Sequence, residues 1–338
     1  MPITRRYNYS LRNHNTFGID VMASQFITYD TVDELITILK ETYDKHQHIL
    51  HIGSGSNLLF TQDFDGTVLH SNIKFIEYVS RSNQEIIVRA GSGVVWDDFC
   101  AAMAQQNNYG CENLSYIPGE VGAAAVQNIG AYGVEVESII KEVETIEIAT
   151  GQPRVFQVEE CEYGYRDSIF KNSLKGQYIV TAVVFSLSAT PVVNLDYGQL
   201  KNLRSLDQMP TAQEIRDAVI AIRKSKLPEP SQLGSAGSFF KNPVVPAELF
   251  LNLALSYNEI PHFVINESEV KIPAAWLIEQ CGLKGKCYGG AAVYEKQPLI
   301  IVNKCHATPA HIMQLASLIQ KSVSDKFNIN IYPEVNYI

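Results

Sequence analysis

Residues 115–133 read Ser-Tyr-Ile-Pro-Gly-Glu-Val-Gly-Ala-Ala-Ala-Val-Gln-Asn-Ile-Gly-Ala-Tyr-Gly, in which four glycines are separated mostly by small or apolar residues. A packed helix seldom carries so much glycine, whereas a loop that brings its amide groups close to a phosphate needs positions without bulky side chains. The stretch lacks the spacing of the dinucleotide-binding and Walker fingerprints. From composition alone it is either a backbone cradle for an anion or a run of tight turns.

The chain carries, in this order, Pro118-Gly119 with Gly122, residues 127–133, and residues 163–171, which read Tyr-Gly-Tyr-Arg-Asp-Ser-Ile-Phe-Lys. This order resembles that of the UDP-N-acetylenolpyruvoylglucosamine reductase (MurB) family. Residues 15–20 (Asn-Thr-Phe-Gly-Ile-Asp) and 333–335 (Pro-Glu-Val) also resemble that family, so the similarity covers nearly the whole chain.

The bulk composition is that of a soluble globular protein. A chain of 338 residues is too long for one small core, so two or three subdomains are expected. Its hydrophobic content of 46% is ordinary for such a protein. A net charge of −9 without a basic run argues against a nucleic-acid surface. The six cysteines include no Cys-x-x-Cys pair, and no apolar run is long enough for a signal peptide or a bilayer span. We therefore expect a cytoplasmic protein with reduced thiols and no metal site.

The hydrophobic pattern predicts an α+β fold in which strands outnumber helices. Amphipathic helices are expected over 31–45, 94–107, 211–226 and 309–326, and shorter ones after Pro246 and Pro273. Strands are expected at 49–52, 67–70, 74–79, 85–90, 140–150, 154–158, 178–187, 298–302 and 329–337. Leu227-Pro228-Glu229-Pro230 cannot stay helical, and a small, polar stretch follows it. This break places a domain boundary near residue 226.

Residues 237–243, Gly-Ser-Phe-Phe-Lys-Asn-Pro, bring a hydroxyl, an ammonium and an amide together. No Gly-x-Ser-x-Gly elbow surrounds Ser238, so a hydrolase triad is not indicated, and proton donation fits better. The alternative is a surface turn anchored by its two phenylalanines. By the resemblance, this stretch matches the motif that carries the family's catalytic serine.

Arg166 and Glu334 also correspond to catalytic positions of the family. A guanidinium is suited to forking onto a substrate carboxylate, although Arg166 could equally form a surface pair with Asp167. Glu334 would by default be a solvated carboxylate. In a catalytic role Glu334 would have to be protonated or steer a proton, which requires that burial raise the pKa of its carboxyl group.

The resemblance also implies contacts to a nucleotide-sugar substrate and to FAD. Tyr165, Tyr197, Lys226, Asn242 and Gln297 match substrate-binding positions, and Tyr197-Gly198 resembles the tyrosine-bearing loop of one family subtype. Tyr294 stands where many relatives have histidine, and no proton transfer is assigned to it. The expected FAD-binding residues are Gly53, Ser54, Gly55, Ser56, Asn57, Leu58, Ser115, Pro118, Gly119, Val121, Gly122, Ala123, Gln127, Asn128, Gly130, Ala131 and Gly133.

What the resemblance implies is an FAD-binding unit of the vanillyl-alcohol-oxidase (PCMH) type in two parts, 1–74 and 75–225. These parts are followed by a substrate-binding domain over 226–327 and by a strand over 328–338 that returns to the FAD-binding unit. Such a monomeric enzyme would use NADPH and noncovalent FAD to reduce UDP-N-acetylglucosamine enolpyruvate to UDP-N-acetylmuramate for peptidoglycan. Two alternatives stay open: a flavin oxidase or dehydrogenase acting on another substrate, and a non-catalytic nucleotide-sugar binding module.

Overall fold

The computed structural model describes residues 3–43, 48–205 and 208–338. The chain packs into two compact units that interleave along the sequence. Unit 1 comprises Met1–Tyr9, Met22–Ser54 and Phe64–Ser225, and unit 2 comprises Ser10–Val21, Gly55–Asp63 and Lys226–Ile338. Residues 10–21 and 55–63, which the sequence analysis grouped with residues 1–74, therefore pack with residues 226–338.

Unit 1 begins with a four-stranded sheet in the order β1-β2-β5-β3. The strands are β1 (Thr4–Ser10), β2 (Met22–Tyr29), β3 (Ile49–Ile52) and β5 (Phe64–Ser71), and β5 pairs in parallel with β2 and β3. The expected helix over 31–45 is α1 (Val32–Tyr43), and its last two predicted positions lie outside the described residues. At its start Glu34 donates its N–H to the Thr31 hydroxyl at 3.2 Å, which is one of the two hydrogen bonds of a capping box.

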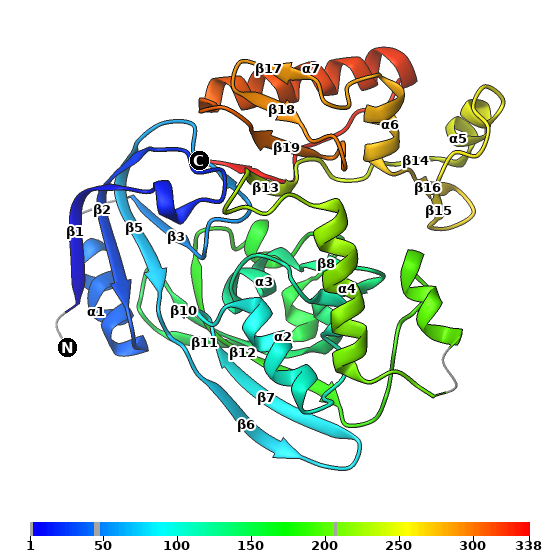
Figure 1. The fold of residues 1–338 in the computed structure, drawn as a ribbon. Coiled ribbons are helices and arrows are strands. Elements are labelled where there is room, and N and C mark those ends of the chain that lie inside the picture. The colour runs from blue at the N-terminus through cyan, green and yellow to red at the C-terminus, as the bar shows by residue number, and fades with distance from the viewer. Residues whose placement is uncertain (1–2, 44–47, 206–207) are drawn as a thin grey trace. The chain divides into compact units, whose positions relative to one another are not determined.

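The second sheet of unit 1 is antiparallel, with the order β11-β10-β12-β7-β6. It contains β6 (Ile76–Arg81), β7 (Glu85–Gly91), β10 (Ile140–Glu147), β11 (Pro153–Gln157) and β12 (Tyr178–Ser188), which confirms the strands predicted for this region. Two helices, α2 (Trp96–Gln105) and α3 (Val121–Gln127), lie against it (Figure 1). The ring centroids of Phe99 and Phe185 are 4.6 Å apart in the core between α2 and β12.

Helix α3 corrects the prediction that residues 115–133 are loop throughout. Gly119, Gly130 and Gly133 flank the helix, and between them only Gly122 lies within it. A Cβ on Gly122 would come 2.8 Å from the Ser92 Cβ, so glycine is needed there for close packing. The intervening alanines favour helix, which explains how a glycine-rich stretch can fold this way.

Unit 1 ends with α4 (Ala212–Lys226), the helix expected over 211–226, and a capping box stands at its start. Glu214 donates its N–H to the Thr211 hydroxyl at 3.2 Å, and its carboxylate accepts from the Thr211 N–H at 2.8 Å. Smaller elements of unit 1 are β8 (Gly130–Ala131), β9 (Val134–Glu135) and 3-10 turns at Glu112–Leu114, Val136–Ile139, Val158–Cys161, Ile169–Lys171 and Gly198–Ser205.

Unit 2 contains a sheet in the order β13-β19-β18-β17, and α7 packs on it (Figure 1). The other elements form a second small sheet, β14-β16-β15, and a parallel pair of β20 with β4. Their bounds are Arg12–His14 (a 3-10 turn), β4 Leu58–Leu59, β13 Gly234–Ser238, β14 Val244–Pro246, α5 Ala247–Ala254, β15 Phe263–Val264, β16 Glu269–Lys271, α6 Ala274–Gln280, β17 Cys287–Tyr288, β18 Ala291–Val293, β19 Ile300–Asn303, α7 Pro309–Phe327 and β20 Asn336–Tyr337.

Two predictions for unit 2 need correction. The strand expected over 329–337 is reduced to β20 at 336–337, because Pro333 has no N–H to continue a ladder. Pro246 and Pro273 stand at the N-cap positions of α5 and α6 and not in their first turns. Gly282, which follows the C-cap of α6, has a φ of 69°, the left-handed backbone with which many helices end. No helix among the described residues has the length and apolar character that crossing a membrane requires.

Candidate active site

In unit 2 the backbone places Ser238 beside Glu334. Phe240 forms an antiparallel bridge with Pro333, Glu334 donates its N–H to the Phe239 carbonyl at 2.8 Å, and Lys241 donates to Tyr332 at 2.9 Å. Two of the three predicted catalytic residues, 96 positions apart in the sequence, thus lie on paired backbone segments. Both side chains are half-buried, so each is partly shielded from water and still accessible to a ligand.

Other predicted residues of unit 2 gather around this pair. Asn57 donates its amide to the Glu334 carbonyl at 3.2 Å. Gln297 lies in the turn that leads into β19. Leu299 of the same turn accepts the Phe239 N–H on its carbonyl at 2.8 Å. The Asn242 Oδ1 accepts the Ala274 N–H at 2.9 Å and so caps α6, which gives this residue a structural role next to its predicted one.

Tyr294, which stands where the sequence analysis expected histidine in many relatives, packs against the core of the unit 2 sheet. It lies on the buried cluster of Ala292, Ile300 and Val302. Its ring therefore has a packing role in unit 2.

In unit 1, Arg166 lies in a tight turn at the C-terminal end of α3. Gly164 and Asp167 exchange backbone hydrogen bonds at 3.1 and 2.9 Å, which leaves Arg166 at the turn's third position with a φ of 56°. Its guanidinium donates to the carbonyls of Gly130 and Asn128, the latter at 3.5 Å. A cation is favoured at this end of a helix, so the backbone holds the Arg166 charge in place.

The residues around Arg166 are tied to one another and to the backbone. Lys171 donates from Nζ to the Gln127 Oε1 at 2.9 Å and to the Arg166 carbonyl at 2.8 Å. Asn128 is fully buried, donating to Glu135 and to the Gly164 carbonyl and accepting the Glu137 N–H. The amide groups of Gln127 and Asn128 therefore already support the Arg166 turn.

The glycine-serine loop after β3 meets a residue that the sequence analysis did not select. Glu120, 7% exposed, accepts from the Ser54 hydroxyl at 3.1 Å and lies 2.9 Å from the His70 Nε2. The Val121 and Gly122 amides donate to the carbonyls of Val94 and Ser92. These groups, which we expected to face a pyrophosphate, are thus engaged within the protein.

Ser115 is the residue of this region that most needs a partner. Its side chain is 0% exposed, and its hydroxyl has no hydrogen-bond partner in the described part of the chain. A buried hydroxyl without a partner costs about 1–3 kcal/mol, so a polar ligand atom at this position would offset a penalty that the protein otherwise carries. This observation fits a polar cofactor bound at the Ser115 loop.

The remaining predicted flavin-binding residues of unit 1 lie before, within or after α3. They are Pro118, Gly119, Ala123, Gly130, Ala131 and Gly133. The close approach at Gly130, where a Cβ would stand 2.5 Å from the Arg166 Nη1, requires glycine at that position.

Arg223 of α4 is a candidate that sequence reasoning missed. Its Nε donates to the Tyr116 carbonyl at 3.0 Å, and burial lowers the pKa of its guanidinium, an effect to which the nearby Arg166 charge adds. Two arginines of unit 1 therefore face one region. The available signal was the spacing of Arg223 and Lys226, which places both on one face of the predicted helix.

The two predicted tyrosines of unit 1 lie on separate segments. Tyr197 is 43% exposed and makes an edge-to-face contact with Tyr132 at 5.7 Å between ring centroids, while Tyr165 stacks near the Arg166 guanidinium at 5.5 Å. Lys226 is exposed at the end of α4. The described residues contain no group of three or more histidine, cysteine or acidic side chains arranged to hold a metal ion.

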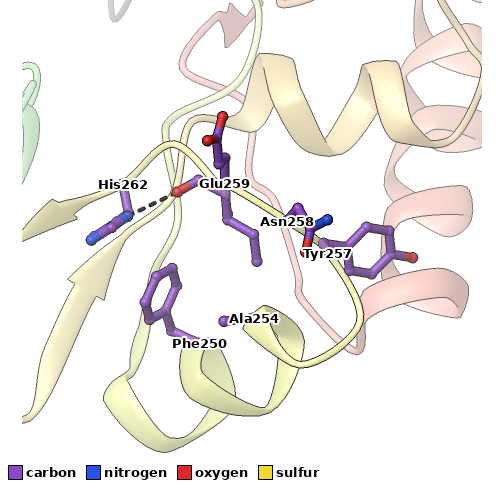
Figure 2. Close-up of a pocket in the computed structure, with 7 residues that line it drawn as sticks. Phe250, Ala254, Tyr257, Asn258, Glu259 and His262 are labelled. Atoms are coloured by element: carbon purple, nitrogen blue, oxygen red, sulfur yellow. Dashed lines mark hydrogen bonds between the residues drawn. The ribbon is translucent and has the colours of Figure 1, made fainter.

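Two cavities of unit 2 contain none of the predicted site residues. Figure 2 shows one of about 530 Å³ beside α5, where Phe250 and His262 face each other with ring centroids 4.4 Å apart. The His262 Nδ1 donates to the Ile260 carbonyl at 2.8 Å. The other cavity, of about 540 Å³, is lined by the loop at residues 12–18 and by parts of 230–234 and 303–306.

Two family models match the chain. Residues 23–156 match the FAD binding domain, and residues 229–338 match the C-terminal domain of UDP-N-acetylenolpyruvoylglucosamine reductase. The first match contains the Ser115 loop and α3, and the second contains Ser238 and Glu334.

Full-length similarity extends to individual proteins. The UDP-N-acetylenolpyruvoylglucosamine reductase of Bacteroides fragilis is 50% identical over 332 residues, covering 98% of this chain and 99% of the relative. The structure of that reductase from Thermus caldophilus is similar with a TM-score of 0.68 at 22% identity, covering 100% and 99% of the two chains. Substrate-bound p-cresol methylhydroxylase gives a TM-score of 0.50 at 14% identity over 94% and 82%, which confirms the α+β flavin fold that was expected.

Proposed function

Because the chain belongs to the UDP-N-acetylenolpyruvoylglucosamine reductase (MurB) family and is an FAD-dependent oxidoreductase, we propose that it reduces UDP-N-acetylglucosamine enolpyruvate to UDP-N-acetylmuramate with NADPH as reductant. This reaction would supply peptidoglycan precursors in the cytoplasm, with the enzyme acting as a monomer. The proposal divides the chain into FAD-binding parts at 1–74 and 75–225, a substrate domain at 226–327 and a final strand at 328–338. The observation that carries it is the pairing of the Ser238 and Glu334 segments.

Ser238 is proposed as the proton donor to the carbon next to the substrate carboxylate. The bridge between Phe240 and Pro333 fixes its backbone beside Glu334, so the hydroxyl and the carboxyl can act on the same substrate. A positioned general acid contributes about 10²–10⁴-fold to rate. Glu334 would orient the substrate or steer the proton.

Arg166 is proposed to bind the substrate carboxylate, where negative charge builds as the double bond is reduced. Its turn and the two carbonyl contacts hold the guanidinium before substrate arrives, which is the preorganisation that electrostatic catalysis requires. Arg223 would add positive charge on the same side.

The cofactor-binding residues are proposed to be those of the Gly53–Leu58 loop and of the Ser115–Gly133 stretch. FAD held by these residues would supply the hydride chemistry that links NADPH to the vinyl group of the substrate. The Ser115 hydroxyl would satisfy its hydrogen bonding on the cofactor, and the small residues around α3 would allow the backbone to approach it. Neither loop contains a histidine or cysteine, which supports noncovalent binding.

The proposed substrate-binding residues lie in both units. Lys226 and Tyr197 suit diphosphate oxygens, since an ammonium and a phenol both donate to phosphate. Asn242 and Gln297 offer amides close in sequence or space to Ser238, and Tyr165 stands next to Arg166.

The test is the consumption of NADPH by the purified yellow protein with and without the enolpyruvyl substrate. We expect rapid, stoichiometric oxidation only when the substrate is present, with UDP-N-acetylmuramate as product. NADPH oxidation that is equally fast without substrate and that consumes oxygen would contradict the reductase proposal and indicate an oxidase. A colourless protein that binds the nucleotide sugar would indicate a binding module.

A further inference from the structure

A second candidate ligand site lies in unit 2, in the cavity of about 540 Å³ lined by residues from three distant segments. These are the turn at 12–18, the stretch at 230–234 and the end of β19 at 303–306. The volume is within the range of small-molecule sites and is larger than inorganic phosphate needs. None of the residues assigned above to catalysis, cofactor or substrate lines it.

The walls of this cavity are fixed by hydrogen bonds. Asn303 donates from Nδ2 to the Phe17 carbonyl at 2.9 Å and accepts the Ala307 N–H at 2.7 Å, so its amide connects two walls. Ser235 donates its N–H to the Thr16 carbonyl at 2.9 Å. A Cβ on Gly234 would lie 2.4 Å from the Phe17 carbonyl oxygen, so the two walls touch through a glycine. The cavity is therefore formed before any ligand arrives.

The charged side chains that line the cavity are both cationic. Arg12 and Lys304 are exposed, His306 adds an imidazole, and no carboxylate is among the lining residues. In the described chain Arg12 makes no ion pair, and Lys304 contacts only the weak acceptor Cys287 Sγ, at 3.8 Å. Two unneutralised cations at one concave site are notable in a chain of net charge −9.

We propose that this cavity binds a small organic phosphomonoester, with Arg12 and Lys304 on the phosphate and the organic part against Thr16 and Pro230. An arginine fork presents two donors to phosphate oxygens, and a lysine supplies a point charge beside it. The site is separate from Ser238, because Gly234 and Ser238 are at opposite ends of β13, about 13 Å apart at 3.3 Å per residue. Binding weakens with added salt, since both cations are exposed to solvent.

The test uses the full-length, FAD-loaded protein and ribose 5-phosphate as the probe in titration calorimetry. We expect one site per chain, with ribose undetected and inorganic phosphate binding more weakly. The double variant Arg12→Gln/Lys304→Gln should weaken the affinity at least 30-fold, because each lost charged contact is a factor of about 10 or more. Lys321→Gln, which removes an exposed lysine of α7 outside the cavity, should change it less than 2-fold.

Two further results decide the assignment. Saturation with UDP should leave ribose 5-phosphate binding unchanged, whereas displacement by UDP would place the probe at the nucleotide-sugar site and overturn the proposal. The proposal would also be overturned if the wild type showed no binding at about 10 mM probe, if inorganic phosphate bound with equal affinity, or if the double variant kept its affinity. Equal melting temperatures of wild type and double variant should show that the variant is folded.

Discussion

At the scale of single residues, the candidate site of unit 1 is marked by left-handed backbone at non-glycine positions. Tyr116, Asn128, Tyr132 and Arg166 have φ values of 61°, 46°, 50° and 56°. A non-glycine residue in this region costs about 1 kcal/mol, and such residues persist where their surroundings hold them. The Arg166 turn is held by its own carbonyl contacts and by Lys171, so the strain coincides with the residue proposed to bind a carboxylate.

Ser238→Ala should separate the two half-reactions. Reduction of bound flavin by NADPH needs no proton from Ser238 and should stay nearly normal, whereas flavin reoxidation by substrate should slow about 10²–10⁴-fold. Rapid-mixing absorbance measures both steps. Ser256→Ala, an exposed serine of unit 2, is the matched control and should leave both rates unchanged. Wild-type reoxidation in Ser238→Ala would make Ser238 a turn residue and direct attention to Glu334.

His51 should make the protein less stable as the pH falls. Desolvation lowers the pKa of His51 from 6.5 to about 3, with a smaller contribution from His70, and Tyr29 bonds its Nε2 at 2.8 Å. The folded state keeps this imidazole neutral while the unfolded chain binds a proton below 6.5. Its contribution to stability is therefore complete above pH 6.5 and is lost at about 1.4 kcal/mol per pH unit toward pH 3.

The measurement is urea unfolding of wild type and His51→Gln at pH 7 and pH 5. Glutamine removes the titration while it keeps an acceptor for the Tyr29 hydroxyl. We expect the wild type to lose about 2 kcal/mol more than the variant between these pH values. An identical loss in the two proteins would show that His51 does not carry the effect.

At the scale of elements, the sequence predicted what local signals specify. The capping box of Thr211 and Glu214 stands at the start of α4, with Thr211 directly before the first helical residue. The apolar face of this helix, with Ile215 and Val219, is buried. Glycine content alone predicts loop where α3 forms, because glycine disfavours helix. The packing of Gly122 on Ser92 that makes glycine acceptable there is a tertiary contact, which composition does not reveal.

The candidate site shows the same limit. Ser238, Glu334 and Arg166 could be selected from motifs, but the pairing of residues 239–241 with 332–334 spans more than 90 positions and has no local signature. Glu120 and Arg223 were not selected, because a lone glutamate or a helical arginine is by default a solvated surface residue. Only burial and partners distinguish them from such residues.

The ion pair between α4 and α2 should contribute strongly to the stability of unit 1. Arg216 forks onto both Asp97 oxygens, and although burial opposes it, this contact and the Tyr116 N–H lower the pKa of Asp97. Arg216→Ala leaves a shielded carboxylate without its partner and should cost about 3 kcal/mol. Arg204→Ala, which removes the exposed pair with Asp196, should cost less than about 1 kcal/mol. Denaturant midpoints compare the two, and equal losses would contradict a special role for the α2–α4 pair.

At the scale of the whole molecule, the two units are not consecutive in sequence. Residues 10–21 and 55–63 are two segments of unit 2 that lie in the sequence between segments of unit 1. Strand β4 of the second segment pairs with β20 near the C-terminus. The linker at 227–230 is visible from its prolines, and the change of unit between Ser225 and Lys226 lies beside it. Residues 10–21 and 55–63 have no comparable break in sequence, because their place in unit 2 depends on long-range contacts with residues 226–338.

Removal of the flavin should lower the thermal stability of the protein reversibly. Ligand that binds only the folded state stabilises it by about 2.7 kcal/mol at 100 times Kd, which for a unit of this size is a shift of roughly 5–10 °C. Ser115 supplies a structural reason, since its buried hydroxyl has no partner in the described residues. The melting temperature of flavin-free protein should therefore rise with the logarithm of added FAD.

The experiment prepares flavin-free protein by acid precipitation, which should leave the yellow colour in the supernatant if the flavin is noncovalent. Melting is then followed as FAD is added back, with riboflavin as the control that lacks the pyrophosphate and adenosine. We expect full recovery with FAD and little with riboflavin, because the Gly53–Leu58 loop and the Ser115 loop are proposed to meet the pyrophosphate. Colour that stays with the precipitate would contradict noncovalent binding, and equal stabilisation by riboflavin would place the binding energy on the ring system and remove the pyrophosphate role from residues 53–58 and 115–133.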